Sequence, residues 1–174
     1  MSEDIDQFIF PQVICLGEAL VDRLGPLGGD PLVIKGVQDC LGGAPANVAC
    51  GLAKLGTKVA FLGRLGNDDI GVHFKDVFKA CGVNLHGLQI DPIKPSRVVL
   101  VRRDLNGERS FQGFLGDLGE GYADQAFSVN DLRDVFSLLL QNARWALVGT
   151  IPLASQSSEE ALLWCVEKAI ESGV

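Results

Sequence analysis

The stretch Leu41-Gly42-Gly43-Ala44-Pro45-Ala46-Asn47-Val48-Ala49 places two adjacent glycines at the start of an apolar helical pattern. Adjacent glycines let the backbone approach a ligand closely, and a helix that begins after them directs free N–H groups at the same place. Asn47, in the first turn, offers a donor and an acceptor, which suits a hydroxyl group. The stretch also fits a glycine-rich turn that only caps a helix, so this segment alone leaves both interpretations open.

Strand and helix patterns alternate on both sides of this stretch. They predict strands over 13–17, 32–35, 58–62 and 145–149, and helices over 44–55, 69–81, 131–140 and 158–172. Asn130 is predicted to cap the third helix, and 157–160 reads as a capping box for the fourth. Trp145 and Trp164 fit buried strand and helix positions. The alternation predicts an α/β fold with a doubly wound, mainly parallel sheet flanked by helices.

A different pattern interrupts this alternation. Residues 97–104 and 108–114 form two extended runs joined across Asn106-Gly107, a strong hairpin signal. We therefore expect a small antiparallel flap that stands off the main sheet.

Two further segments carry polar residues next to glycines. Asp22 follows the first predicted strand, and ligands of open α/β sheets bind beyond the carboxyl ends of strands, so Asp22 is placed to accept hydrogen bonds from a polyol. A solvated loop acid is the alternative. In the glycine-rich segment 63–71, Asp68 and Asp69 fit the start of a helix, where acids complement the helix dipole. That segment lacks the spacing of a dinucleotide fingerprint, and the chain has no P-loop pattern.

Composition narrows the classes of partner. A formal net charge of −7 and a pI near 4.7 argue against nucleic acid and anionic membranes as partners. Five scattered cysteines and two histidines show no metal-ligand spacing, which favours structural thiols in a reducing compartment. The acidic segment 1–6 lacks a signal-peptide core, and no apolar stretch has the length of a membrane span. We therefore expect a cytoplasmic protein.

Taken together, five segments in order resemble the amino-terminal half of PfkB-type (ribokinase-like) carbohydrate kinases, above all the fructokinase-like members. These segments are Gly17–Asp22 for GE-x-L-x-D, Gly42, Gly43, Asn47 and Ala49 for GG-x-x-x-N-x-A, Gly63, Gly66, Asp68 and Gly71 for G-x-x-G-x-D-x-x-G, Gly107–Phe111 for a GERSF-like lid string, and Val148–Leu153 for G-S-I-P-L. The resemblance implies that residues 1–174 form the amino-terminal part of one α/β kinase domain. It places lid strands within about 31–36 and 96–115, and it implies that the nucleotide-binding part is absent from this chain.

The resemblance also implies a function. A full-length protein would transfer a phosphoryl group from ATP, with Mg²⁺, to a sugar hydroxyl, with fructose to fructose 6-phosphate as the leading reaction. Asp22, Gly42, Gly43 and Asn47 would hold the sugar, the hairpin would close over it, and two lids could pair in a homodimer. The alternatives are a PfkB-type kinase for another sugar, a sugar acid or a nucleoside, and a non-catalytic scaffold of the same fold.

The chain departs from the family pattern in two places. The second signature, D-T-x-G-A-G-D, is absent, so the catalytic Asp is expected beyond Val174 and the chain alone is predicted to lack kinase activity. On the lid, Gly113-Phe114-Leu115 stands where many fructokinases have a phenylalanine–tyrosine–arginine string, followed by the unusual stretch 116–121. The missing arginine leaves the identity of the sugar open.

Overall fold

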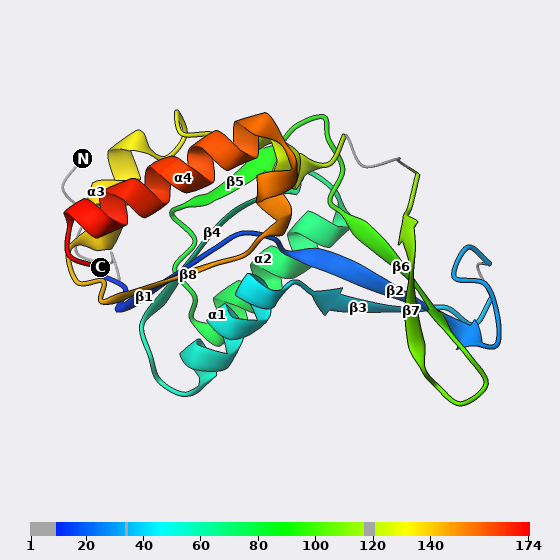
Figure 1. Ribbon diagram of the computed structural model, residues 1–174. Coiled ribbons are helices and arrows are strands. Elements are labelled where there is room, and N and C mark those ends of the chain that lie inside the picture. Colours follow the sequence, from blue (N-terminus) through cyan, green and yellow to red (C-terminus); the bar gives the residue numbers. More distant parts are fainter. Residues whose placement is uncertain (1–9, 34, 117–120) are drawn as a thin grey trace.

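Two four-stranded sheets of different construction organise the chain (Figure 1). The computed structural model describes residues 10–33, 35–116 and 121–174. The expectations for segment 1–6, and for most of 116–121, therefore lie outside the described residues. No helix in the described ranges is long and apolar enough to cross a membrane.

The larger sheet is parallel throughout. Its strands lie in the order β5 (Leu88–Asp91), β4 (Val59–Gly66), β1 (Val13–Leu16) and β8 (Trp145–Val148). β1 and β4 form the centre, and all four residues of β1 pair in register with Val59–Leu62. Continuous apolar strands of this kind require cover on both faces.

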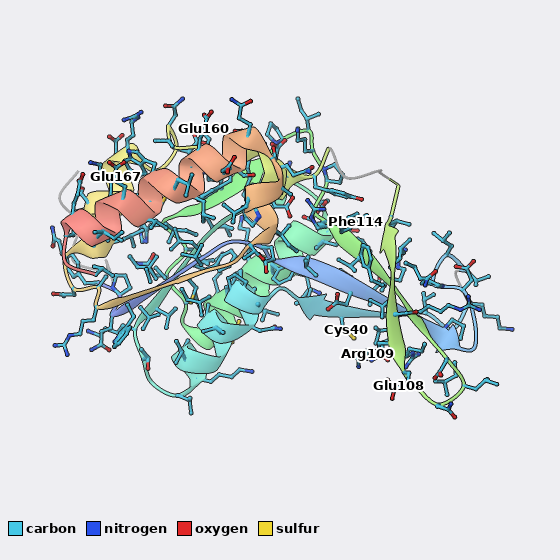
Figure 2. The ribbon with its side chains drawn as sticks, viewed as in Figure 1. Cys40, Glu108, Arg109, Phe114, Glu160 and Glu167 are labelled. Atoms are coloured by element: carbon cyan, nitrogen blue, oxygen red, sulfur yellow. The ribbon has the colours of Figure 1, made fainter. Side chains whose placement is uncertain are left out.

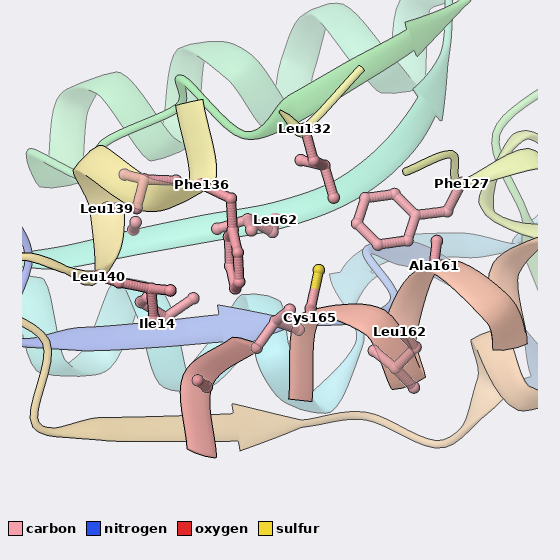
Figure 3. Packing of buried hydrophobic residues seen from close by; sticks show 13 residues of the cluster. Ile14, Leu62, Phe127, Leu132, Phe136, Leu139, Leu140, Ala161, Leu162 and Cys165 are labelled. Carbon is pink, nitrogen blue, oxygen red and sulfur yellow. The ribbon is translucent and has the colours of Figure 1, made fainter. Parts of the chain in front are cut away.

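Helices supply that cover, and the strands alternate between the two faces. Ile14 and Leu16 point toward α3 (Arg133–Leu140) and α4 (Gln156–Glu171), as Figure 3 shows for this core. Cys15 points to the other face, toward α1 (Ala44–Lys54) and α2 (Asp69–Cys81). Other members of these two cores include Ala60, Leu62, Phe127, Phe136 and Leu162 on the α3–α4 side, and Val59, Phe61, Ala46, Phe74 and Phe78 on the α1–α2 side. This arrangement confirms the predicted doubly wound α/β fold.

The smaller sheet extends away from the larger one, and we call it the lid sheet (Figure 1). Its order is β3 (Gln38–Gly42), β2 (Leu20–Leu27), β6 (Val98–Arg103) and β7 (Arg109–Phe114). The predicted hairpin is confirmed as β6 and β7, with Gly107 at a φ of 89° in its turn. The sheet is mixed rather than purely antiparallel, because β2 runs parallel to β6.

The first predicted lid strand is wrong. The described residues of 31–36 form turns, and the amide of Leu32 donates to Asp30 Oδ1 at 2.8 Å. The strand begins only at Gln38, where it can pair with β2. β2 and β5 were not predicted as strands, since their pairing depends on segments distant in the sequence.

Helix starts were predicted with mixed success. Asp68 caps α2 as expected, accepting from the Gly71 amide at 2.8 Å. Asn130 does not cap α3, which begins at Arg133 without a side-chain cap. The capping box at 157–160 is also wrong, because α4 already begins at Gln156. The Ser158 hydroxyl lies inside the helix and donates back to the Pro152 and Ser155 carbonyls.

The prediction that Trp145 occupies a buried strand position is wrong. Trp145 is 72% exposed, because β8 is an edge strand of the larger sheet and pairs only with β1 among the described strands. Trp164 is half-buried on α4, with its ring centroid 5.4 Å from that of Phe136.

Candidate functional site

Asp22 lies near the start of β2, on the lid sheet, rather than in a loop after the first strand. It sits opposite Cys40 of β3 and Val99 of β6. The side chain is half-buried, and burial raises the pKa of its carboxyl above the ordinary value, while the positive charge of Arg109 on β7 partly offsets this. Figure 2 shows Cys40 and Arg109 on the lid. Asp22 is therefore an acceptor shielded by the lid rather than a fully solvated acid.

Gly42 lies directly beside this carboxylate, and Gly43 is the next residue along the chain. A Cβ atom on Gly42 would lie 2.5 Å from Asp22 Oδ2, so the acid occupies the space that a side chain would need. Gly43 follows as the N-cap of α1, with a φ of 95° that favours glycine. The structure thus brings Asp22, Gly42 and Gly43 together where the lid sheet meets the first helix.

Asn47 lies one helical turn further on. Its amide donates to the Gly43 carbonyl at 2.9 Å, which continues α1, and its side chain is exposed. Within the described part of the chain, the side chains of Asp22 and Asn47 make no hydrogen bond, so both can bond to a ligand. Together they offer acceptors and one donor, the pattern that hydroxyl groups match.

The start of α1 offers fewer free amides than the sequence suggested, because Glu18 takes part of them. Backbone N–H groups of Ala44 and Ile151 bond to the Glu18 carboxyl, and Pro45 has no N–H. Glu18 is only 5% exposed; burial raises its pKa most, these amides lower it, and nearby Asp124 raises it. One amide at the start of α1, that of Ala44, is therefore taken by a protein carboxyl.

Three side chains near the site were missed as functional candidates. Glu18 and Arg109 belong to sequence motifs quoted above, but no role was predicted for either residue. Arg97 was only the first residue of a predicted strand. Arg109 can be linked to Asp22 only once β2 and β7 are known to share a sheet. A signal for Glu18 existed, since it follows a buried strand and Gly17 directly, and an unpaired acid is rarely buried.

The described residues provide no metal centre of their own: among them, no group of three His, Cys, Asp or Glu side chains could hold a metal ion. The site described here is thus built from one carboxylate, one carboxamide and two glycines at the base of a lid.

Comparison with known proteins places this geometry in a family. Residues 11–174 match the pfkB family of carbohydrate kinases. The chain belongs to this family. It is 30% identical over 94% of its length to a probable chloroplastic fructokinase of Arabidopsis thaliana, of which it covers 41%.

Solved structures that are similar to the chain include two fructokinases with bound ligands. A fructokinase from Xylella fastidiosa with bound ATP has a TM-score of 0.75 and 29% identity, with 92% of this chain and 45% of that one covered. A fructokinase from Vibrio cholerae with bound fructose, ADP and calcium has a TM-score of 0.73 and 28% identity, with 95% and 49% covered. The chain spans about half the length of the relatives it matches.

Proposed function

We propose that this chain carries the sugar-binding part of a kinase that phosphorylates a sugar hydroxyl, with fructose as the first candidate and fructose 6-phosphate as product. The observation that carries the proposal is the Asp22 carboxylate, which lies over Gly42 at the base of the lid sheet. The fructose-bound relative supports the choice of sugar. Five unpaired cysteines support a cytoplasmic location.

In this proposal the chain's own residues bind and orient the sugar. Asp22 accepts hydrogen bonds from sugar hydroxyls, Asn47 donates and accepts, and the glycines let the ring approach the backbone. The lid sheet covers the sugar and excludes water, which would otherwise compete as phosphoryl acceptor. Holding one hydroxyl in line with the phosphoryl group supplies much of the catalysis in phosphoryl transfer.

ATP is the proposed phosphoryl donor, supported by the ATP-bound and ADP-bound relatives. Mg²⁺ as its counter-ion is proposed from the family resemblance alone. Neither is assigned to a residue of this chain. The described residues hold no candidate metal cluster, and the sequence lacks the D-T-x-G-A-G-D signature. A catalytic base is likewise assigned to none of these residues.

Sugar binding by the purified chain tests the proposal. Isothermal titration with fructose, glucose, ribose and a nucleoside is expected to give the tightest binding for fructose. Asp22→Asn should weaken that binding about 10- to 100-fold, because hydrogen bonds to a charged group contribute about 1.5–3 kcal/mol. Asp76→Asn is the matched control, since Asp76 is exposed on α2, away from the lid. Absence of binding to any sugar, or equal loss in both variants, would contradict the proposal.

A second proposal concerns the partner of the lid. Large apolar side chains are exposed on the lid sheet and its loops, namely Leu27, Leu32, Val33, Leu105 and Phe111. Among the described strands, β7 is also an edge strand, which leaves backbone groups on its outer side for pairing. We propose that a second copy of the chain covers this surface.

The dimer is tested by sedimentation equilibrium. Phe111→Ser is expected to raise the dimer dissociation constant about tenfold or more, because a large apolar side chain leaves the interface. Leu55→Ser is the control, since Leu55 is 82% exposed but lies on the main body after α1. A monomer at all concentrations, or equal effects of the two substitutions, would count against a lid dimer.

A further inference from the structure

Arg97 lies where β6 leaves the body, and its charge is almost completely enclosed. Its side chain and that of Asp124 are each 3% exposed. Arg97 Nε donates to Asp124 Oδ2 at 2.7 Å, and Nη2 donates to Oδ1 at 2.9 Å. This two-pronged geometry fixes the planes of both groups as well as their distance.

The two partners belong to different parts of the molecule. Asp124 lies in the short helix η1 (Ala123–Ala126), which packs against β4 and α4 of the body. Arg97 directly precedes lid strand β6, and its carbonyl accepts from the Val21 amide of β2 at 3.0 Å. Among the ion pairs of the described residues, this is the one that joins the lid to the body.

Two aromatic rings contact the same guanidinium, one from the other strand of the hairpin and one from the residue before η1. Its Cζ lies 4.7 Å from the ring centroid of Phe114, the last residue of β7, and 4.4 Å from that of Tyr122. The Tyr122 hydroxyl donates to the Leu115 carbonyl at 3.0 Å. One side chain therefore contacts the end of β7, the start of β6 and the body together.

The strand register shows what this contact controls. Val99 lies opposite both Asp22 on β2 and Phe114 on β7. Residues paired in register share a face, and Arg97 Cζ lies over the Phe114 ring, so its guanidinium lies on the face that carries Asp22. Fixing Arg97 against Asp124 thus fixes the tilt of the Asp22 face relative to Gly43 and α1.

Leu115 stands at the position where the resemblance leads us to expect a lid arginine. Its amide donates to the Val98 carbonyl at 3.0 Å, so Leu115 is adjacent to Arg97 across the hairpin. The guanidinium beside Phe114 therefore comes from the neighbouring strand. We propose that Arg97, locked to Asp124, is a positioning residue that holds the lid in place.

Amide hydrogen exchange of the full chain without sugar tests the lock, independently of the proposed function. Arg97→Ala should speed exchange at the Val21, Leu115 and Ala123 amides, which bond at the lid base, by about tenfold or more, while β1 and β4 amides stay within about threefold. Arg97→Lys keeps the charge but loses the two-pronged hydrogen bonding to Asp124. It is expected to speed exchange at the same amides, to a smaller extent. If Arg97→Ala does not fold, Arg97→Lys carries the test.

Arg23→Ala is the matched control. Arg23 also forms a two-pronged pair, with Asp39, but that pair lies within the lid and is partly exposed. It should leave the lid-base amides unchanged. Equal acceleration of all amides, no acceleration, the same effect from Arg23→Ala, or unfolding of Arg97→Lys would each overturn the proposal. Where fructose binding is observed, Arg97→Lys should also weaken it about tenfold, a consequence that rests on the proposed function.

Discussion

Gly43→Ala is expected to lower the free energy of unfolding by about 3–5 kcal/mol, because strained backbone and overpacking act at one position. Gly43 has a φ of 95°, which L side chains rarely adopt. An added Cβ would also lie 2.5 Å from the Glu18 carbonyl oxygen and 3.1 Å from Ala19 Cα. These atoms are backbone, so α1 would have to move away from the turn between β1 and β2.

The control for this substitution lies in the same helix. Gly51 is in α1, and a Cβ there would meet no atom within 4 Å. Gly51→Ala should therefore stabilise the fold by about 0.5–1 kcal/mol through better helix propensity. Urea unfolding of both variants measures the difference. A loss of less than about 1 kcal/mol for Gly43→Ala would show that the turn adapts without strain, contrary to its geometry.

Local signals explain which elements were predictable. Asp68 before α2 and Gly82 after it mark both ends of that helix, and Asn106-Gly107 marks the hairpin turn. Each of these signals acts through its own neighbours in the sequence, so no knowledge of the sheet order is needed. The same holds for the alternating faces of β1, where a short apolar run indicates burial on both sides.

Features that depend on distant partners were not predictable. β2 contains Asp22, Arg23, Gly25 and Pro26, which disfavour a strand locally, and its pairing with β6 stabilises it across more than 70 residues of sequence. The exposure of Trp145 depends on the edge position of β8. Both are properties of sheet order, which residue patterns do not encode.

The residues of the candidate site likewise fall into those that sequence patterns predict and those that only the structure shows. Asp22, Gly42, Gly43 and Asn47 were found because they stand in recognisable patterns, and the structure places the first three in direct proximity. Their role in sugar binding stays a prediction. The groups that support them, such as Arg97 with Asp124, lie 27 residues apart and carry no pattern of their own.

Two substitutions of Glu18 should change the free energy of unfolding in opposite directions. Glu18→Ala should lower the free energy of unfolding by about 1–3 kcal/mol, because it removes the carboxyl that accepts from the N–H groups of Ala44 and Ile151. Glu18→Gln keeps an acceptor oxygen and removes a buried charge. Since Glu18 Oε2 has no hydrogen-bond partner among the described residues, the amide variant should be at least as stable as the wild type at neutral pH.

The pH dependence of the free energy of unfolding distinguishes the effect of the buried Glu18 charge from a simple loss of contacts. Burial raises the pKa of Glu18 in the folded state, so the folded chain binds its proton more tightly than the unfolded chain. The stabilisation from this group is complete below its unfolded pKa, about 4.3, and is lost as pH rises through the folded pKa. Urea unfolding between about pH 4.5 and pH 8 should therefore show Glu18→Gln gaining on the wild type as pH increases. A wild type that gains on the glutamine variant over this range would mean that an ionised Glu18 has a favourable partner, and that the carboxylate, rather than the neutral acid, ties α1 to the turn at Ile151.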